Sequence, residues 1–555
     1  MIIPGSLIAG IAGLLGTLPG GGVHGGFVPA GYHAVAFVND TLSHGTLGDG
    51  LLSLNEAILL HNGQLSFAQL SPAEQAQLSL IPGTGATTDV TWIDIDGSNT
   101  PVITVQQDLA PVLDTSFGLL IKGFSDPPVL DFSGPGVLNG MVAPANSLTL
   151  QDLVFSGGPF GLDVTQTDAS GQVGCALIGV RFVGQAQFGV RVTATTPNGT
   201  GRLVLENCRF ENMPSAILFD ETPAGRTSIF EAHQVDIVGT SYGIDAALGS
   251  GGSTRYTFDR VTVQAQQRGI RVGRSPTASR QAFLEGAFVR VRSTQCALFD
   301  CHPSGLTWAV LQLWDLKAPA GGTAMQLGAP GSAWFGALDE LTLEGATVFG
   351  AGAGGQPITL HNLRLKNGPV TLATSASQSL TLSDSRFDNC ALTVGTGTVA
   401  MNGCCFVGGS LQAAAGASAQ LSGCHASAVG ANVQVALPLP APQLGSMSIV
   451  PEDVTVGGSV QMNVDLPPGL IAVFALGFTD PTPTLLTPPY HFYFDTASYV
   501  MVPGAYLLQQ GFTWSVPNGP TFVGIDLVAH AAVLPLAGVQ APWLQLPPPK
   551  RFVLR

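Results

Sequence analysis

Residues 203–210 read LVLENCRF, and the pattern of this octapeptide recurs through the middle of the chain. Its first, third, sixth and eighth places are apolar, here Leu203, Leu205, Cys208 and Phe210. Octapeptides of the same pattern also begin at positions 148, 175, 230, 256, 282, 309, 341, 358, 380, 399 and 419. Self-similarity at spacings of roughly 20 to 50 residues is the signature of a solenoid, in which each repeat packs only against its neighbours.

Each copy of the pattern predicts two short strands joined by a turn of one residue. Apolar and polar places alternate on either side of the fifth place, where the alternation changes phase. A further apolar pair follows in most repeats, as in Leu162/Val164 and Ile217/Phe219, and predicts a third strand. Stacked turns of this kind form a parallel β-helix. We expect it to be right-handed, because parallel crossovers are overwhelmingly so.

The composition supports this all-β fold. Among 555 residues there are 71 Gly and 39 Pro, which disfavour long helices, and only 10% of residues are charged. The hydrophobic fraction of 45% and the chain length are sufficient for a large core. We therefore predict a β-helix of twelve or more coils over residues 100–437.

Two capping boxes precede the repeats and predict a helical cap within residues 23–99. Ser53 and Glu56 begin the first helix, which Asn62-Gly63 would end. Ser71 and Glu74 begin the second, with Pro72 at its first helical position. A helix laid over the first rung would cover its unpaired edge.

The repeats stop at the proline-rich stretch 437–442, and a second domain is expected at residues 446–555. Its segments SVQMNVDL and HFYFDT alternate apolar and polar residues. This alternation predicts a small antiparallel β-sandwich.

Two stretches resemble known extracellular proteins. AVAFVNDTLSHGTLGDGLLSLNEAILLHNG, followed by VITVQQDLAPVLDTSFGLLIKGF, resembles the N-terminal region of secreted bacterial right-handed parallel β-helix proteins, which carry a GxLSLREAI-type helix. Asn55 stands where those proteins usually have Arg, and Ala110-Pro111-Val112 only approximates their turn. The segment FTWSVPNGPTFVGIDLVAHAAV is similar to a C-terminal module of planctomycete-like bacteria. The resemblance implies a pectin lyase-like fold over about residues 30–435 and no defined activity.

The N-terminus favours export. Residues 2–18 are apolar and Gly20-Gly21-Gly22 supplies small residues for cleavage, so residues 1–22 are interpreted as a signal peptide. The stretch has no positive side chain before its apolar core, and a buried apolar tail is the alternative. We expect a secreted or cell-surface protein with no transmembrane span in the mature chain.

Charge and cysteine spacing exclude several function classes. The formal net charge is −15 and the chain has four lysines, so nucleic acid is not an expected partner. No phosphate loop or dinucleotide fingerprint is present, and no cofactor is expected. Cys208, Cys404 and Cys424 occupy inward places and are interpreted as core residues, so no metal site is expected. Cys296 and Cys301 predict a local disulfide or no bond.

One outward row carries the candidate chemistry. The fourth places of four successive copies are Glu206, His233, Asp259 and Glu285, which would lie about 4.8 Å apart on adjacent rungs. Asp259 and Glu285 at that spacing suit a catalytic carboxylate pair in which one carboxyl group has a raised pKa. Arg181 and Arg209, at seventh places, are the candidate substrate-binding residues. A second outward row predicts ion pairs of Asp163 with Arg191 and of Asp245 with Arg271.

Two functions fit this sequence. The first is a structural, adhesive or carbohydrate-binding β-helix whose partner is a polysaccharide or the cell envelope. The alternative is a polysaccharide lyase or glycoside hydrolase that uses Glu206, His233, Asp259 and Glu285. A groove over the row would favour the enzyme, and a flat face would favour the binding protein.

Overall fold

The computed structural model confirms a β-solenoid followed by a β-sandwich, and 65% of the chain is strand. It describes residues 34–43, 48–80, 90–113, 118–143, 147–166, 172–194, 199–221, 227–248, 253–272, 281–300, 306–319, 321–328, 333–350, 357–373, 379–424, 430, 433–435, 446–452, 454–466, 470–487, 490–494, 500–501, 506–507, 511–535 and 547–555. The expected signal peptide lies outside these residues.

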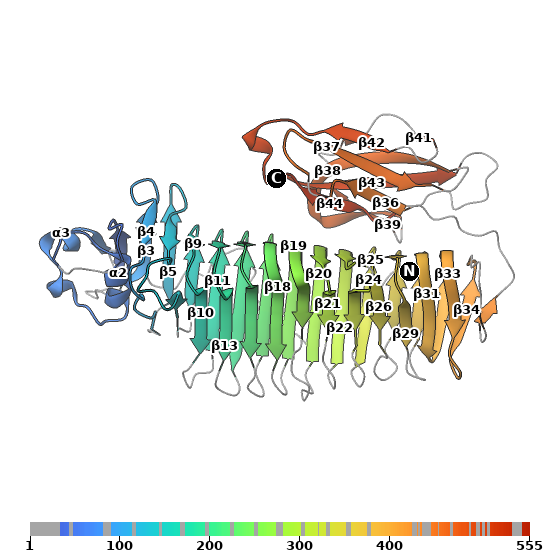
Figure 1. Ribbon diagram of the computed structural model, residues 1–555, viewed down its shortest axis with the longest axis horizontal. Helices are drawn as coiled ribbons and strands as arrows, with labels where there is room; N and C mark the ends of the chain where they lie inside the picture. Colours follow the sequence, from blue (N-terminus) through green and yellow to red (C-terminus); the bar gives the residue numbers. More distant parts are fainter. Residues whose placement is uncertain are drawn as a thin grey trace.

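Three parallel ladders form the sides of the solenoid (Figure 1). The first is β3 (Val90–Asp96), β5 (Leu119–Phe124), β8 (Leu148–Gln151), β11 (Gln172–Ile178), β14 (Thr200–Glu206), β17 (Thr227–His233), β19 (Ser253–Val272), β20 (Gln281–Ser293), β22 (Leu306–Lys317), β24 (Ala333–Asp339), β27 (Ile358–His361), β30 (Leu380–Ser383), β32 (Thr398–Asn402), β34 (Ser418–Ser422) and β35 (Val433–Val435). The second joins β4 (Val102–Thr104), β6 (Val129–Asp131), β9 (Val154–Ser156), β12 (Arg181–Val183), β15 (Arg209–Glu211), the start of β18 (Asp236–Leu248), the middle of β19, the ends of β20 and β22, β25 (Thr342–Glu344), β28 (Arg364–Lys366), the start of β31 (Arg386–Thr396) and the start of β33 (Cys405–Ala413). The third joins β7 (Met141–Val142), β10 (Phe160–Gln166), β13 (Phe188–Ala194), β16 (Ser215–Glu221), the ends of β18 and β19, β21 (Cys296–Asp300), β23 (Thr323–Leu327), β26 (Ala346–Phe349), β29 (Val370–Ala373), and the ends of β31 and β33.

The number of turns is lower than expected. The solenoid has about nine turns, and the prediction of twelve or more is wrong. An octapeptide match marks the first strand of a rung, whereas a regular turn needs all three sides.

The inward columns are buried as predicted. Leu150, Leu177, Leu205 and Phe258 are each 0% exposed, so the predicted inward places of these repeats are confirmed. The eighth places stack as aromatic rings, with Phe182 between Phe155 and Phe210 at centroid separations of 4.9 and 5.1 Å. The core is therefore a set of columns in which each side chain packs on its counterpart one rung away.

The fifth place is the one-residue turn. It has a left-handed backbone in rung after rung, with φ of 52° at Asn207, 54° at Gln234, 57° at Phe288 and 57° at Leu313. Because the chain changes direction at this residue, the side chains before and after it project from different outer faces. Asn tolerates this conformation, but bulky residues adopt it only where the surrounding structure holds them.

Two of the twelve octapeptides are out of register. Tyr256 pairs with Leu284 rather than Ala282, and Leu338 rather than Leu343 continues the first ladder into Leu360. In both rungs a glycine occupies an inward place and conceals the pattern. A Cβ on Gly286 would lie 2.5 Å from Phe258 O, and one on Gly336 would lie 1.9 Å from Ala309 O. The indole of Trp314 lies against Gly286 and donates a hydrogen bond of 2.9 Å to its carbonyl oxygen.

The N-terminal cap has the helices that the capping boxes predicted. They are α2 (Leu54–His61), a 3-10 turn (Phe67–Gln69) and α3 (Pro72–Gln75), with β1 (Ala34–Val38) paired to β2 (Leu78–Leu80) and to β3. Both boxes form, Ser53 with Glu56 and Ser71 with Glu74. Asn55 Oδ1 accepts a hydrogen bond from Ala110 N at 2.8 Å. Asn55, which stands where the resembled proteins have Arg, therefore fixes the turn at Ala110.

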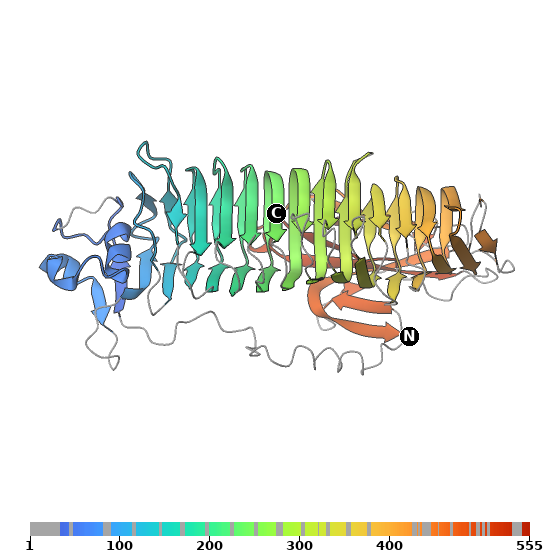
Figure 2. The same ribbon diagram turned by 90° about the horizontal axis from the view of Figure 1, so that it is seen from below.

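The C-terminal unit is a sandwich of two antiparallel sheets. One has β36 (Ser446–Val450), β37 (Ser459–Asp465) and β42 (Phe512–Ser515); the other has β38 (Leu470–Thr487), β39 (Tyr490–Phe494), β40 (Val500–Met501), β41 (Tyr506–Leu507), β43 (Asp526–Pro535) and β44 (Lys550–Val553), and a 3-10 turn spans Pro520–Phe522. Met462, Phe474 and Ala531 are buried between the sheets. Figures 1 and 2 show the sandwich lying along the side of the solenoid, away from the helical cap.

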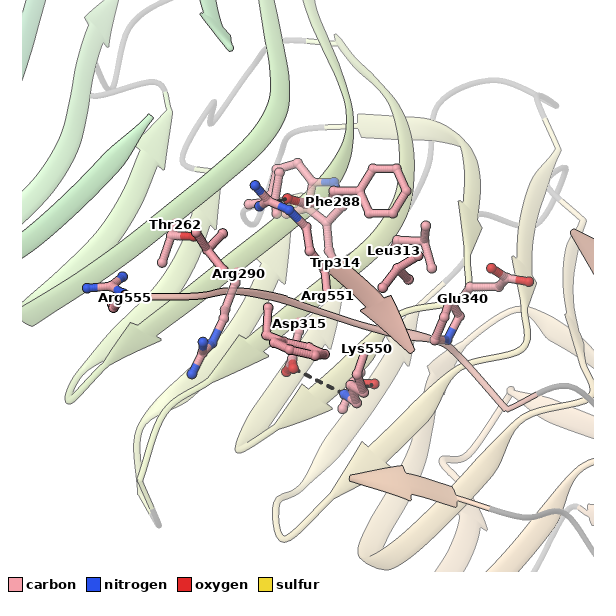
Figure 3. A pocket seen from close by; sticks show the side chains of 16 residues that line it. Thr262, Phe288, Arg290, Leu313, Trp314, Asp315, Glu340, Lys550, Arg551 and Arg555 are labelled. Carbon is pink, nitrogen blue, oxygen red and sulfur yellow. Dashed lines mark hydrogen bonds and ion pairs between the residues drawn. The ribbon is translucent and has the colours of Figure 1, made fainter. Parts of the chain in front are cut away.

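The sandwich contacts the solenoid through the strained turns. Phe288 and Leu313, both left-handed, pack against Ala475 and Val528. Figure 3 shows Phe288 and Leu313 beside a cavity of about 30 Å³, with Lys550 bonded to Asp315 below them. Bulky apolar residues at the fifth place thus mark the rungs on which the sandwich docks.

Removing the ring of Phe182 tests the stacked core. Phe182→Ala should lower the free energy of unfolding by about 3–5 kcal/mol, because the cavity lies between two immobile rings. Urea denaturation followed by circular dichroism measures this change. Phe124→Ala removes a ring that is 37% exposed and serves as the control. Equal losses in the two variants would contradict the columnar core.

Candidate functional site

Three of the four predicted row residues are contiguous on the outer face of the first ladder. Glu206 pairs in register with His233, and His233 with Asp259. His233 Nδ1 lies 3.7 Å from Asp259 Oδ2, and Arg260 Nη2 lies 2.9 Å from the same oxygen. In this row the carboxylate of Asp259 therefore lies beside both the imidazole of His233 and the guanidinium of Arg260.

Glu285 does not continue this row. Asp259 pairs with Ala287, whereas Glu285 pairs with Thr257, two residues along the strand. The Glu285 carboxylate accepts a hydrogen bond of 2.6 Å from Arg255 and one of 3.0 Å from Thr257. The prediction of adjacent carboxylates was wrong because Gly286 fills an inward place and shifted the apparent repeat by two residues.

The electrostatics of Asp259 also differ from those of a like-charged pair. Burial alone would raise the pKa of this carboxyl, but hydrogen bonds from His233 and Arg260 and the positive charge of Arg260 hold it below its ordinary value. Asp259 is therefore an ionised hydrogen-bond acceptor, not a carboxylic acid poised to donate a proton.

Arg181 and Arg209 lie on the outer face of the second ladder, which we call the second outer face. They pair in register with each other, and both contact Glu211, Arg181 at 2.9 Å. Arg209 also lies 3.9 Å from Asp236. The left-handed turn at Asn207 separates them from Glu206, so the two predicted groups of site residues face different directions.

The row has a second histidine centre, of which the sequence pattern gave His361, at the fourth place of the copy that begins at position 358, but not Asp339. Gln312 pairs with Asp339, and Asp339 with His361. His361 Nδ1 lies 2.6 Å from Asp339 Oδ1, and its Nε2 lies 3.5 Å from Asp384 Oδ2. An octapeptide read from Gly336 places Asp339 at the fourth position, so the correct register would have identified it.

A ladder of aromatic residues lies on the same strands as the row. Phe283 pairs with Trp308, and Trp308 with Phe335, at the place just before each repeat begins. Ring centroids are 5.6 Å apart for Phe283 and Trp308 and 6.5 Å apart for Trp308 and Phe335. The three rings are half-buried, and Val310, two residues beyond Trp308, is 38% exposed. We call Phe283, Trp308 and Phe335 the aromatic ladder.

The aromatic ladder lies beside charged residues on its N-terminal side. Arg255 is the partner of Phe283 on the preceding rung and forms an ion pair with Glu285. The outer face of the first ladder therefore presents apolar rings, an exposed aliphatic side chain and ion-paired groups side by side.

The second predicted row forms the expected ion pairs. Arg191 bonds to Asp163, and Arg271 Nη1 lies 3.7 Å from Asp245 Oδ2. Both pairs join adjacent rungs of the third ladder. They stabilise the stack modestly, since partly exposed ion pairs contribute about 0–1 kcal/mol.

The cysteines pack as side chains of the columns. Cys208 and Cys404 are buried as expected, and Cys424 is half-buried beside Cys404. The seven cysteines within the described ranges are free thiols, and Cys301 lies outside those ranges. The described residues contain no group of three or more metal-ligating side chains.

Comparison with known proteins adds no family. No family model, curated protein or solved structure matches the chain. The β-solenoid agrees with the β-helix that the resemblance implied, whereas the pectin lyase-like assignment and the finer relationship rest on the sequence motifs. Within the described segments, no helix has the length and apolar character needed to cross a membrane.

His361 makes stability depend on pH. Burial alone would lower its pKa, but Asp339 and Asp384 raise it to about 9. The folded state therefore binds the proton more tightly than the unfolded state, so this stabilisation is complete below about pH 6.5 and is lost as pH rises towards 9. The loss should be about 3 kcal/mol in the free energy of unfolding. His361→Gln should flatten the curve between these pH values, and an unchanged slope would show that His361 is not its source.

Cys424 should be the most reactive thiol among the described cysteines. Hydrogen bonds from the Cys404 thiol and the Cys404 backbone lower the pKa of Cys424, whereas burial raises that of Cys208 to about 12. Thiolate is the reactive form. Brief treatment with iodoacetamide at pH 7, followed by peptide mass spectrometry, should label Cys424 before Cys208. Labelling of Cys208 first would contradict the assignment.

Proposed function

We propose that this protein is a secreted or cell-surface β-helix that binds polysaccharide along the outer face of its first ladder. The observation that carries this proposal is the aromatic ladder, three rings on consecutive rungs of a rigid sheet. Single exposed apolar residues are common on protein surfaces, but contiguous apolar patches mark binding sites.

The chemistry of the aromatic ladder suits a sugar chain. Pyranose rings have apolar faces of C–H groups that pack on aromatic rings, and hydroxyl groups around their edges that need polar partners. Rungs repeat about every 4.8 Å, so a polymer can contact several of them in succession. The rigid sheet holds the rings in place, which limits the entropy lost on binding.

Polar side chains that can bind the sugar hydroxyls lie next to the aromatic ladder. Arg255 and Glu285 flank the aromatic ladder, and His233 and Asp259 continue the polar part of the same face. In this proposal Glu206, His233, Asp259 and Glu285 bind sugar hydroxyls. Their placement favours binding over cleavage, because Asp259 and Glu285 do not form the facing pair that glycoside hydrolysis requires.

Extracellular location is part of the proposal. It is supported by the apolar residues 2–18 and by the resemblance of residues 34–63 to secreted β-helix proteins. A polysaccharide ligand would be met at the envelope of a cell or outside it.

Trp308→Ala tests the proposal. Affinity electrophoresis through gels containing a neutral β-glucan or polygalacturonate should show retardation of the wild type in at least one gel. Removing the central ring should weaken binding about tenfold or more, because a buried aromatic contact contributes about 1–3 kcal/mol. Trp308→Phe should retain most of the affinity.

Phe478→Ala is the matched control. This ring is 48% exposed but lies on β38 of the sandwich, so its loss should not change the mobility. Equal weakening in both variants, or no retardation of the wild type in either gel, would contradict the proposal. Release of new reducing ends or unsaturated products during incubation would instead support the enzymatic alternative.

A further inference from the structure

Two thiols lie one rung apart near the end of the solenoid that is away from the helical cap, where Figure 1 shows β34. Cys404 and Cys424 both occupy the sixth place of a repeat and are 20 residues apart. The strands before them, β32 and β34, pair in register up to Asn402 and Ser422, and a left-handed glycine follows in both rungs. The two cysteines therefore have equivalent positions in consecutive rungs.

The hydrogen bonds of the two thiols repeat from one rung to the next. The Cys404 thiol donates to the carbonyl oxygen of Leu382 at 3.6 Å, and the Cys424 thiol donates to that of Met401 at 3.3 Å. Leu382 and Met401 pair in register on adjacent strands. Both thiols therefore point the same way within one inward column.

The two cysteines also contact each other. The Cys404 backbone N–H donates a hydrogen bond of 3.3 Å to Cys424 Sγ, and the thiols hydrogen-bond to one another. Strands paired in register hold their Cα atoms about 4.8 Å apart. Disulfides join Cα atoms that are about 4.4–6.8 Å apart. A bond between these sulfur atoms therefore needs no separation or shift of the rungs.

Cys208 shows that packing alone does not require this pair. It also occupies a sixth place, and its thiol donates to the carbonyl oxygen of Leu177 at 3.3 Å. Its neighbours at the same place, one rung before and one rung after, are Val180 and Val235, and both are buried. Valine thus fills this column as well as cysteine does, so two consecutive thiols call for an explanation other than volume.

We propose that Cys404 and Cys424 are an oxidation site at which thiol–disulfide exchange with a small-molecule disulfide joins the rungs of β32 and β34 by a covalent bond. The bond would hold these rungs together near the end of the stack. The extracellular location proposed above is one in which disulfides persist. The site itself does not depend on the polysaccharide ligand, because both thiols lie in the inward column.

The exchange has two steps, written here for oxidised glutathione. The Cys424 thiolate attacks one sulfur of the glutathione disulfide, whose S–S bond breaks, and one glutathione leaves as a thiolate. The Cys404 thiolate then attacks the Cys424 sulfur of the mixed disulfide, and the second glutathione leaves. The protons of the two cysteines pass through water to the released glutathiones, so two protein thiols are oxidised and one disulfide is reduced.

Burial and charge explain this order. Cys424 is half-buried, whereas Cys404 is 0% exposed, so the oxidant reaches Cys424 first. Hydrogen bonds from Cys404 lower the pKa of the Cys424 thiol, and burial together with the neighbouring Cys424 raises the pKa of Cys404. Once Cys424 carries glutathione, its negative charge is gone and Cys404 loses its proton more readily. An accessible thiolate beside a second thiol is the usual arrangement of oxidation sites.

The experiment treats the reduced full chain with oxidised glutathione under native conditions, alkylates the remaining thiols and digests the protein without reduction. Mass spectrometry should find a peptide pair joined through Cys404 and Cys424, lighter by two hydrogen atoms, with no glutathione retained. Fragment ions distinguish Cys404 from the adjacent Cys405. Glutathione retained on Cys424, a bond to any other cysteine, or no reaction of either thiol would overturn the proposal.

Cys404→Val should leave glutathione attached to Cys424, because the thiol that releases it is absent. This variant copies the valines found at the same place in other rungs, so it should fold, which far-ultraviolet circular dichroism checks. Cys405→Ser is the matched control, since it removes the adjacent thiol and should still form the bond. Equal retention of glutathione in Cys404→Val and the wild type would contradict the pairing.

Hydrogen exchange tests whether the bond holds the rungs together. Amides of β34 should exchange about tenfold more slowly in the oxidised chain than in the reduced chain, because a cross-link suppresses local opening of the last rungs. Amides of β5, near the helical cap, should exchange equally in both forms. Equal exchange of β34 in the two forms would show that the bond does not fasten these rungs.

Discussion

The left-handed residue between the first and second strands of each rung is the constraint on which the rest of the structure depends. It closes the turn with one residue, and it divides the outward side chains between two faces. Glu206 and Arg209 are three residues apart yet face different directions because Asn207 lies between them. An aromatic face and a basic face can therefore exist on the same rungs without interfering.

The same turn provides the attachment point of the sandwich. A left-handed conformation costs about 1–2 kcal/mol for a residue with a large side chain, and Phe288 and Leu313 adopt it. Their burial against Ala475 and Val528 offsets that cost. Charged contacts then surround this apolar centre, with Lys550 on Asp315 and Arg555 on Asp236. Strain at the turn and docking of the second unit are thus linked.

Glycine at an inward place also changes the packing of the core. Gly286 and Gly336 leave no room for a Cβ, and the indole of Trp314 donates a hydrogen bond to the carbonyl oxygen of Gly286. These rungs are also where the aromatic ladder runs along the outside. The rungs with a glycine at an inward place therefore carry the docked sandwich on one face and Phe283, Trp308 and Phe335 on the other.

The sequence by itself determined the parallel β-helix, its inward columns, both capping boxes and the antiparallel sandwich, because apolar periodicity and capping chemistry are local. It also placed Glu206, His233 and Asp259 in one row. Only the tertiary structure decided that Glu285 leaves this row, that Asp339 continues it to His361, and that three lysines meet at the sandwich. The physical reason is that a glycine has no side chain to mark an inward place, and that contacts between residues more than 150 positions apart have no periodic signature.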